Sequence, residues 1–103
     1  MTRGQVWGYV QGSRRYRVLI ITSDEHNEQP GILPWALRID RDAAPVDSQL
    51  LVRLGEDDPF IGTVVIPAVV RIDPGALREN LGFAAESTMV AVERGLREFL
   101  ELP

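Results

Sequence analysis

The sequence predicts a mainly β domain of the α+β class, a small barrel with one amphipathic helix at its C-terminal end. Segments rich in β-branched and aromatic residues recur through the first two thirds of the chain. Gly- and Pro-containing turns separate these segments. Only residues 86–100 repeat apolar residues at helical spacing. The 103 residues match the size of one domain, so we expect residues 1–103 to form a single unit.

The strands are predicted from apolar patterns bounded by turns. Residues 5–10 alternate, with Trp7 and Tyr9 on the face opposite Val6. Residues 16–22 contain the continuous apolar run VLII, which is typical of a strand covered on both faces. Further strands are expected at 32–39, 49–54 and 63–72, with exposed loops at 23–31 and 40–48.

Two features concern helix ends. Asp73 followed by Pro74 is typical of a helix N-terminus, and Gly82 can end a helix, so we expect a short helix over 74–81. Ala84-Ala85 precedes the final helix without a capping side chain, unless Ser87 or Thr88 caps a later start. The acidic stretch 56–58 lacks the spacing of a calcium loop and is expected to be a plain turn.

Composition limits the function. All 11 basic residues are arginine, yet 15 acidic residues give a formal net charge of −4, so any nucleic-acid site must be a local group of positive charges. The absence of cysteine excludes disulfides and thiolate metal sites. No apolar run is long enough to span a bilayer, and the N-terminus lacks the pattern of a signal peptide. We therefore expect a cytoplasmic protein that makes no membrane contact.

Residues 14–24, RRYRVLIITSD, gather positive charge directly before a buried strand. Arg14, Arg15 and Arg17 precede the apolar run, and the hydroxyls of Thr22 and Ser23 follow it. Guanidinium groups match phosphate geometry, which indicates an anion site. The alternative is a solvated strand end whose hydroxyls satisfy the backbone.

Other candidate residues have plainer interpretations. His26 is the only histidine and is a candidate for acid or base catalysis, but it lies in a polar loop where a surface role is expected. Arg38 can pair with Asp40 or face a ligand, and both readings stay open. The large aromatic residues could stack bases if exposed, but in strands of a small domain we expect them in the core: Trp7, Tyr9 and Trp35.

Several stretches resemble the MazF/PemK toxin family, in the same order along the chain. They are RGQVW (3–7), VLIITSD (18–24), ALRI (36–39), GTVVIP (62–67) and LGFAAESTMVAVERGLREFLEL (81–102). The resemblance implies an SH3-like barrel, a homodimer, and an endoribonuclease that cuts single-stranded RNA without metal or cofactor. It also implies an antitoxin peptide that blocks the RNA groove.

The family's catalysis resembles attack of a ribose 2′-hydroxyl on the adjacent phosphate, which requires proton transfer and positive charge. The family pattern has an arginine before the apolar run and a threonine after the next strand. This chain has Tyr16 and Asp40 there. We therefore expect Arg15, Arg17 and Asp40 to be catalytic, with Arg15 or Arg17 returned to the site by a bulge. RNA binding is assigned to four further residues: Arg14, Thr22, Ser23 and Arg38.

The departures at Tyr16 and Asp40 favour an alternative, a catalytically eroded barrel that binds nucleic acid or protein without turnover. Some toxins of this barrel type poison DNA gyrase through their terminal helix, and RGLREFLELP (94–103) could serve in that way. A structural or adaptor protein outside the toxin family is the third hypothesis.

Overall fold

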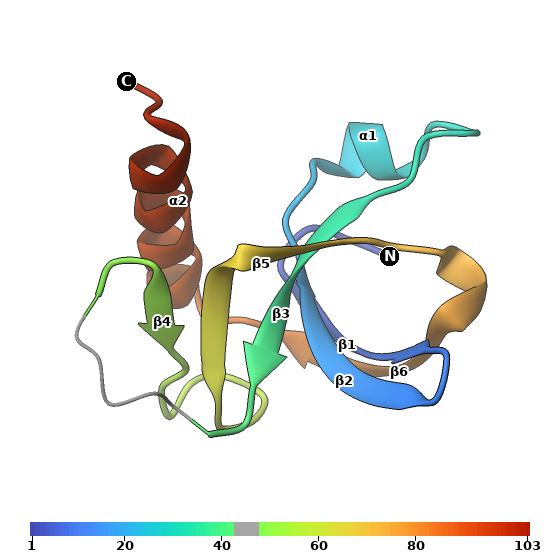
Figure 1. Cartoon of the computed structure of the whole chain (residues 1–103), viewed down its shortest axis with the longest axis horizontal. Helices are drawn as coiled ribbons and strands as arrows, with labels where there is room; N and C mark the ends of the chain where they lie inside the picture. Colours follow the sequence, from blue (N-terminus) through green and yellow to red (C-terminus); the bar gives the residue numbers. More distant parts are fainter. Residues whose placement is uncertain (43–47) are drawn as a thin grey trace.

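The computed structural model describes residues 1–42 and 48–103 and contains one six-stranded antiparallel sheet with a long helix beside it (Figure 1). The strand order is β4-β5-β3-β2-β1-β6. The elements along the chain are β1 (Gln5–Gln11), β2 (Arg14–Ile20), α1 (Asp24–Asn27), β3 (Trp35–Asp40), β4 (Leu51–Arg53), β5 (Thr63–Arg71), the 3₁₀ helix η1 (Pro74–Ala76), β6 (Leu77–Phe83) and α2 (Glu86–Leu100).

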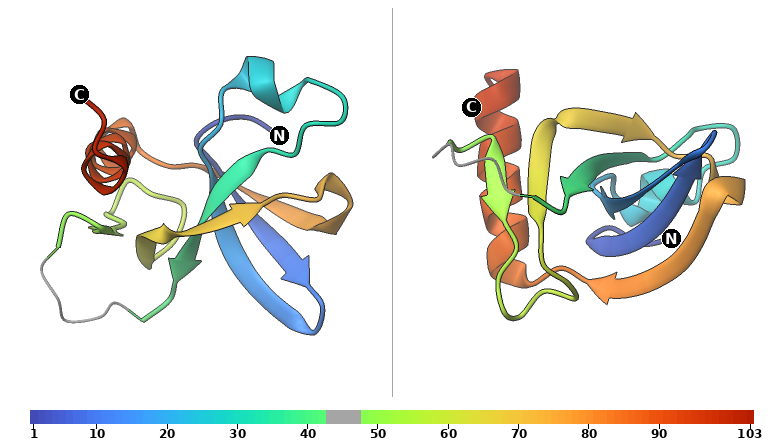
Figure 2. Two further views of the ribbon diagram at one scale, coloured as in Figure 1. Left: turned by 45° about the horizontal axis from the view of Figure 1, so that its top comes forward. Right: turned by 60° about the horizontal axis from the view of Figure 1, so that its bottom comes forward.

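The sheet coils strongly but stays open. The outermost strands, β4 and β6, each pair with one neighbour only among the described residues. Figure 2 shows the sheet curling so that its two halves face different directions, with α2 against the half formed by β4 and β5. The mainly β fold with a C-terminal helix is therefore confirmed, although the sheet is barrel-like only in outline.

Apolar side chains are buried on both faces of the sheet. On one face they form a core that packs against α2: Val6, Leu19, Leu37, Ile39, Val52, Leu54, Val64, Ile66 and Val92. The other face carries a second, smaller core: Tyr9, Val18, Ile20, Ala36 and Ile72. Successive residues of β2 thus lie in different cores, which confirms the prediction of a central strand covered on both sides.

Helix α2 has the bounds that its periodicity predicts, 86–100. Its N-cap residue Ala85 contributes no capping side chain, and Asp58 supplies the cap from the β4–β5 loop. The Asp58 carboxylate accepts hydrogen bonds from Ala85 N (2.7 Å), Thr88 Oγ1 (2.7 Å) and Gly55 N (2.6 Å). One residue of the acidic turn therefore stabilises the helix N-terminus, where a negative charge is favourable.

The predicted helix over 74–81 is wrong. Asp73 does cap a helical turn, accepting from Gly75 N at 3.0 Å, but this 3₁₀ turn ends at Ala76. The following residues form β6, which pairs with the free edge of β1, because hydrogen bonding along that edge satisfies more backbone groups than a short helix. Gly82 adopts a positive φ of 104° within β6 rather than ending a helix.

Smaller differences concern the loops and one aromatic residue. Segment 23–31 contains the four-residue helix α1, capped by Ser23. Trp35 is 47% exposed, so the expectation that it lies in the core is wrong, whereas Tyr9 is buried. Of the loop expected at 40–48, residues 43–47 lie outside the described part of the chain.

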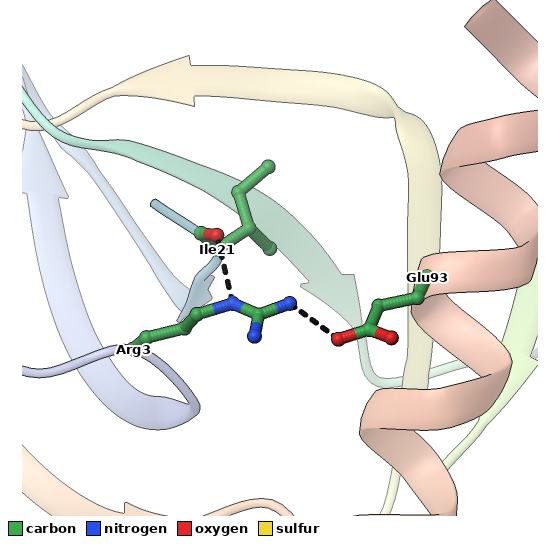
Figure 3. A network of polar contacts seen from close by, with 3 residues as sticks. All are labelled: Arg3, Ile21 and Glu93. Atoms are coloured by element: carbon green, nitrogen blue, oxygen red, sulfur yellow. Dashed lines mark hydrogen bonds and ion pairs between the residues drawn. The ribbon is translucent and has the colours of Figure 1, made fainter. Parts of the chain in front are cut away.

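The N-terminal segment is tied to both the sheet and α2 by Arg3 (Figure 3). Its Nε donates to the carbonyl oxygen of Ile21 at 3.2 Å, and its Nη2 lies 2.6 Å from Oε1 of Glu93. Its backbone N–H donates to Asp24 at 2.8 Å. No helix in the described ranges combines the length and apolar character needed to cross a membrane.

Candidate functional site

One face of the sheet carries a group of polar side chains where β2 and β3 diverge. Val18 pairs with Arg38 and Arg17 with Ile39, so strand alternation places Tyr16, Arg38 and Asp40 on the same face. Cζ of Arg38 lies 5.3 Å from the centroid of the Tyr16 ring. Its Nε lies 3.0 Å from Oδ1 of Asp40. We call these three residues, with Arg14 beside them, the Tyr16 face.

The Arg38–Asp40 pair is accessible to a ligand. The two side chains are 43% and 44% exposed. An exposed ion pair contributes at most about 1 kcal/mol to stability. The cation–π contact with Tyr16 holds the guanidinium in place without using its outward-facing donors. The arrangement therefore presents a fixed cation and a carboxylate to solvent, with the half-buried Tyr16 phenol beside them.

Tyr16 has an altered acidity. Burial, and then the neighbouring Tyr9, raise the pKa of the Tyr16 phenol above 10.0, while Arg38 and Arg14 act in the opposite direction. The phenol donates a hydrogen bond to Oε1 of Gln11 at 2.5 Å. Its ring lies 5.7 Å from that of Tyr9 in a tilted arrangement. At neutral pH Tyr16 is therefore a protonated hydrogen-bond donor.

Arg15 and Arg17 lie on the opposite face of β2. The β1–β2 pairing runs without a register shift, with Gly8 opposite Arg17 and Val10 opposite Arg15. No bulge in this pairing turns either arginine toward Asp40. Cζ of Arg17 lies 4.9 Å from the centroid of the Phe60 ring, and both arginines line a cavity of about 260 Å³. The residues expected to act together are thus divided between two faces.

Thr22 and Ser23 are engaged in local structure. The Thr22 hydroxyl donates to Oδ1 of Asn27 at 2.6 Å and accepts from Trp35 N at 3.2 Å. The Ser23 hydroxyl accepts from His26 N at 3.2 Å at the start of α1. His26 itself is half-buried. In the described ranges, no three His, Cys, Asp or Glu side chains lie close enough together to hold a metal ion.

Comparison with known proteins identifies the fold. No family model matches the sequence, and no curated protein matches it. Among solved structures, an endoribonuclease in complex with its cognate antitoxin, from a mycobacterial species, matches with a TM-score of 0.89 at 24% identity. The match covers 100% of this chain and 97% of that one. This chain shares the fold of that endoribonuclease.

Two further structures support this assignment. A second mycobacterial endoribonuclease matches with a TM-score of 0.87 at 23% identity, covering 100% of this chain and 93% of that one. A MazE–MazF complex from Deinococcus radiodurans matches at 0.79 with 21% identity, covering 100% and 98%. The resemblance to MazF proteins predicted from the sequence is confirmed at the level of the fold.

The structure reveals contacts of site residues that the sequence pattern did not predict. Tyr16 stands where the resemblance expects an arginine, and the guanidinium of Arg38, from the neighbouring strand, lies over its ring. Two other residues were not among the sequence-predicted site residues: Phe60 contacts the Arg17 guanidinium, and Arg78 lines the cavity beside Arg15 and Arg17. Arg78 was missed because it belongs to β6, which had been predicted as helix.

Proposed function

We propose that this protein is an endoribonuclease of a toxin–antitoxin system that cleaves single-stranded RNA, and that the chemical step occurs on the Tyr16 face. The observation that carries the proposal is the half-exposed Arg38–Asp40 pair, held against Tyr16. A cation, a proton acceptor and a proton donor are the three groups that RNA transesterification requires. The fold, shared with endoribonucleases, supports the same reaction.

Each side chain takes one role. The Asp40 carboxylate accepts the proton of a ribose 2′-hydroxyl, whose oxygen then attacks the adjacent phosphorus. The Arg38 guanidinium stabilises the negative charge on the phosphorane, as charge-assisted hydrogen bonds to phosphate oxygens do. The Tyr16 phenol donates its proton to the departing 5′-oxygen. The P–O5′ bond breaks, leaving a 2′,3′-cyclic phosphate and a 5′-hydroxyl end.

The scheme needs no metal ion, since arginine supplies the positive charge. Arg14 adds a second guanidinium near Tyr16 and is assigned to substrate binding. Arg15 and Arg17 lie on the face of β2 away from Asp40, which excludes them from the proposed chemical step. We therefore assign them to substrate binding. Thr22 and Ser23 act through the local structure that they hold together.

An antitoxin and a second copy of the chain are the partners in this proposal. A carboxylate-rich antitoxin segment over the Tyr16 face would pair with Arg14 and Arg38 and exclude RNA by charge and by position. The first matched structure contains a cognate antitoxin, and the third pairs MazF with MazE. The cytoplasm, where RNA is available, is the location that fits this activity.

The test is an incubation of the purified protein with single-stranded RNAs of varied sequence in the presence of a chelator. Wild-type protein is expected to give fragments with 2′,3′-cyclic phosphate and 5′-hydroxyl ends. Asp40→Asn should slow cleavage by about 100-fold, in the range that general base catalysis contributes. Asp42→Asn, an exposed neighbour, is the matched control and should cleave as wild type does. Absence of wild-type cleavage at high protein concentration would contradict the proposal.

The second candidate is a binding module with the same fold and no turnover. It is favoured by the residue types at positions 16 and 40, which differ from the catalytic types that the family resemblance implies. Asp40→Thr separates the candidates. Gain of cleavage in this variant would indicate an eroded enzyme, whereas loss of an existing cleavage activity would identify Asp40 as the working base.

A further inference from the structure

We propose that the cavity between β1, β2 and β6 binds a phosphate group of the RNA strand other than the one being cleaved; this inference rests on the proposed function. The cavity measures about 260 Å³, and three arginines line it: Arg15, Arg17 and Arg78. One water molecule occupies about 30 Å³ in the liquid, so the space admits a phosphate with part of its hydration. Tyr16 also lines the cavity, whereas Arg38 and Asp40 do not, so the space adjoins the proposed catalytic group without containing its cation or its base.

Strand geometry explains why the cavity exists. Arg15 and Arg17 share a face of β2 and pair with Val10 and Gly8 of β1. Gly8 has no side chain, which leaves space above β1. A Cβ at this position would lie 3.1 Å from Cγ of Glu79, tighter than an ordinary van der Waals contact. Glycine at position 8 therefore leaves room for the Glu79 side chain, which lines the cavity.

Two of the arginines, Arg17 and Arg78, are held by groups that carry no negative charge. Arg17 stacks over Phe60, and Nη1 of Arg78 donates to the carbonyl oxygens of Gly75 (2.9 Å) and Leu77 (3.2 Å). Within residues 1–42 and 48–103, none of the three arginines forms an ion pair. Two guanidinium groups held in place, with the exposed Arg15 beside them, form a site for an anion.

Glu79 is the opposing charge in this site. It lines the same cavity and covers Gly8, so its carboxylate weakens the attraction for a phosphate. Three cations outweigh one anion, and the site keeps a net positive charge. This opposing charge also provides a test in which affinity should rise, because neutralising Glu79 should strengthen anion binding.

We assign the cavity to an RNA phosphate because it lies on the same short segment of β2 as the Tyr16 face. An RNA strand bound at one of the two can therefore also reach the other. In the described part of the chain, β3 pairs with Arg17–Ile20 only, so residues 14–16 make no backbone pairing with β3. Figure 2 shows the β1–β2 hairpin projecting beyond β3. A single strand that passes around this hairpin reaches Asp40 on one face and the cavity on the other. Guanidinium forks bind phosphates in two-point contacts.

The experiment measures binding of a fluorescent, 2′-O-methyl single-stranded RNA, which cannot be cleaved, by the full-length protein at several salt concentrations. Arg15→Gln and Arg78→Gln should each weaken binding by about tenfold and reduce the slope of log affinity against log salt by about 1. Glu79→Gln should strengthen binding. Arg94→Gln, an exposed arginine on α2, is the matched control and should bind as wild type does. Thermal melts establish that each variant is folded. If Arg78→Gln does not fold, the measurement on Arg15→Gln alone tests the inference.

The outcomes separate this inference from the proposed function. If the wild type cleaves RNA but Arg15→Gln and Arg78→Gln both bind with the wild-type affinity and salt slope, the cavity inference is overturned and the proposed function stands. If the wild type binds RNA through these arginines without cleaving it, the cavity stands and the proposed function fails. Oligo-glutamate is the competing probe: if Arg15→Gln and Arg78→Gln lose binding of oligo-glutamate but keep binding of RNA, the occupant of the cavity is an acidic peptide and the RNA inference is overturned. A wild type that neither binds nor cleaves RNA overturns both proposals.

Discussion

Tyr16 occupies a position where two cations and a second tyrosine meet, and its acidity reports on that environment. Because burial and Tyr9 raise its pKa above 10.0, the folded protein keeps the phenol proton in a pH range where the unfolded chain has begun to lose it. The folded state then binds more protons than the unfolded state. The free energy of unfolding should therefore fall as the pH rises above about 10.

Two variants test this account of Tyr16. In a spectrophotometric titration of phenolate absorbance, Tyr16→Phe should remove the tyrosine that titrates above 10.0. Arg38→Gln should move the midpoint of Tyr16 further upward, since the Arg38 guanidinium lowers this pKa. Tyr16→Phe should also flatten the alkaline fall in stability. A downward shift in Arg38→Gln would contradict the contact between Arg38 and Tyr16.

Among single residues, the sequence identified some partners and could not place others. Arg38 and Asp40 are two positions apart in a strand, so period-two alternation already allows their pairing. Whether Arg15 or Arg17 joins them depends on a bulge, which no local pattern specifies. The regular β1–β2 register turns both arginines to the other face.

Helix α2 shows how an element depends on a distant residue. The Asp58 carboxylate binds the N-terminal N–H of Ala85 and the hydroxyl of Thr88. Asp58→Ala should lower the free energy of unfolding by about 2 kcal/mol, since a helix cap and a hydrogen bond to a charged group are lost together. Urea denaturation measures the change.

The control for this prediction is Asp57→Ala, which removes an exposed carboxylate from the same turn. It should change stability by less than about 0.5 kcal/mol, as surface substitutions generally do. Equal effects of the two variants would show that the charge of the loop, rather than the cap, stabilises α2.

The elements were predictable where their pattern was long and regular. Periodicity gave α2 its bounds, and the VLII run identified β2 as central. The pattern failed at 74–81, where an N-cap followed by proline starts both a full helix and a single 3₁₀ turn. The unpaired edge of β1 decides between them, and that edge is a property of the sheet rather than of the segment.

At the scale of the whole molecule, an acidic chain concentrates arginines on both faces of one hairpin. The net charge of −4 disfavours RNA binding over the surface as a whole, so in the proposed function the arginines of β2, β3 and β6 determine where a single strand can lie. The composition predicted that any such site would be local. It could not show that β2 divides its arginines between the proposed catalytic face and the cavity proposed to bind a phosphate.

The most direct measurement is the single-turnover rate of RNA cleavage at saturating protein for Arg38→Gln beside Arg17→Gln. The account predicts that Arg38→Gln is slower than wild type by about 100-fold or more, because the phosphorane loses its cation. Arg17→Gln should stay within about tenfold, as expected for a residue that holds a flanking phosphate. If Arg38→Gln cleaves at the wild-type rate while Arg17→Gln does not, the chemistry lies on the other face of β2 and the account is contradicted.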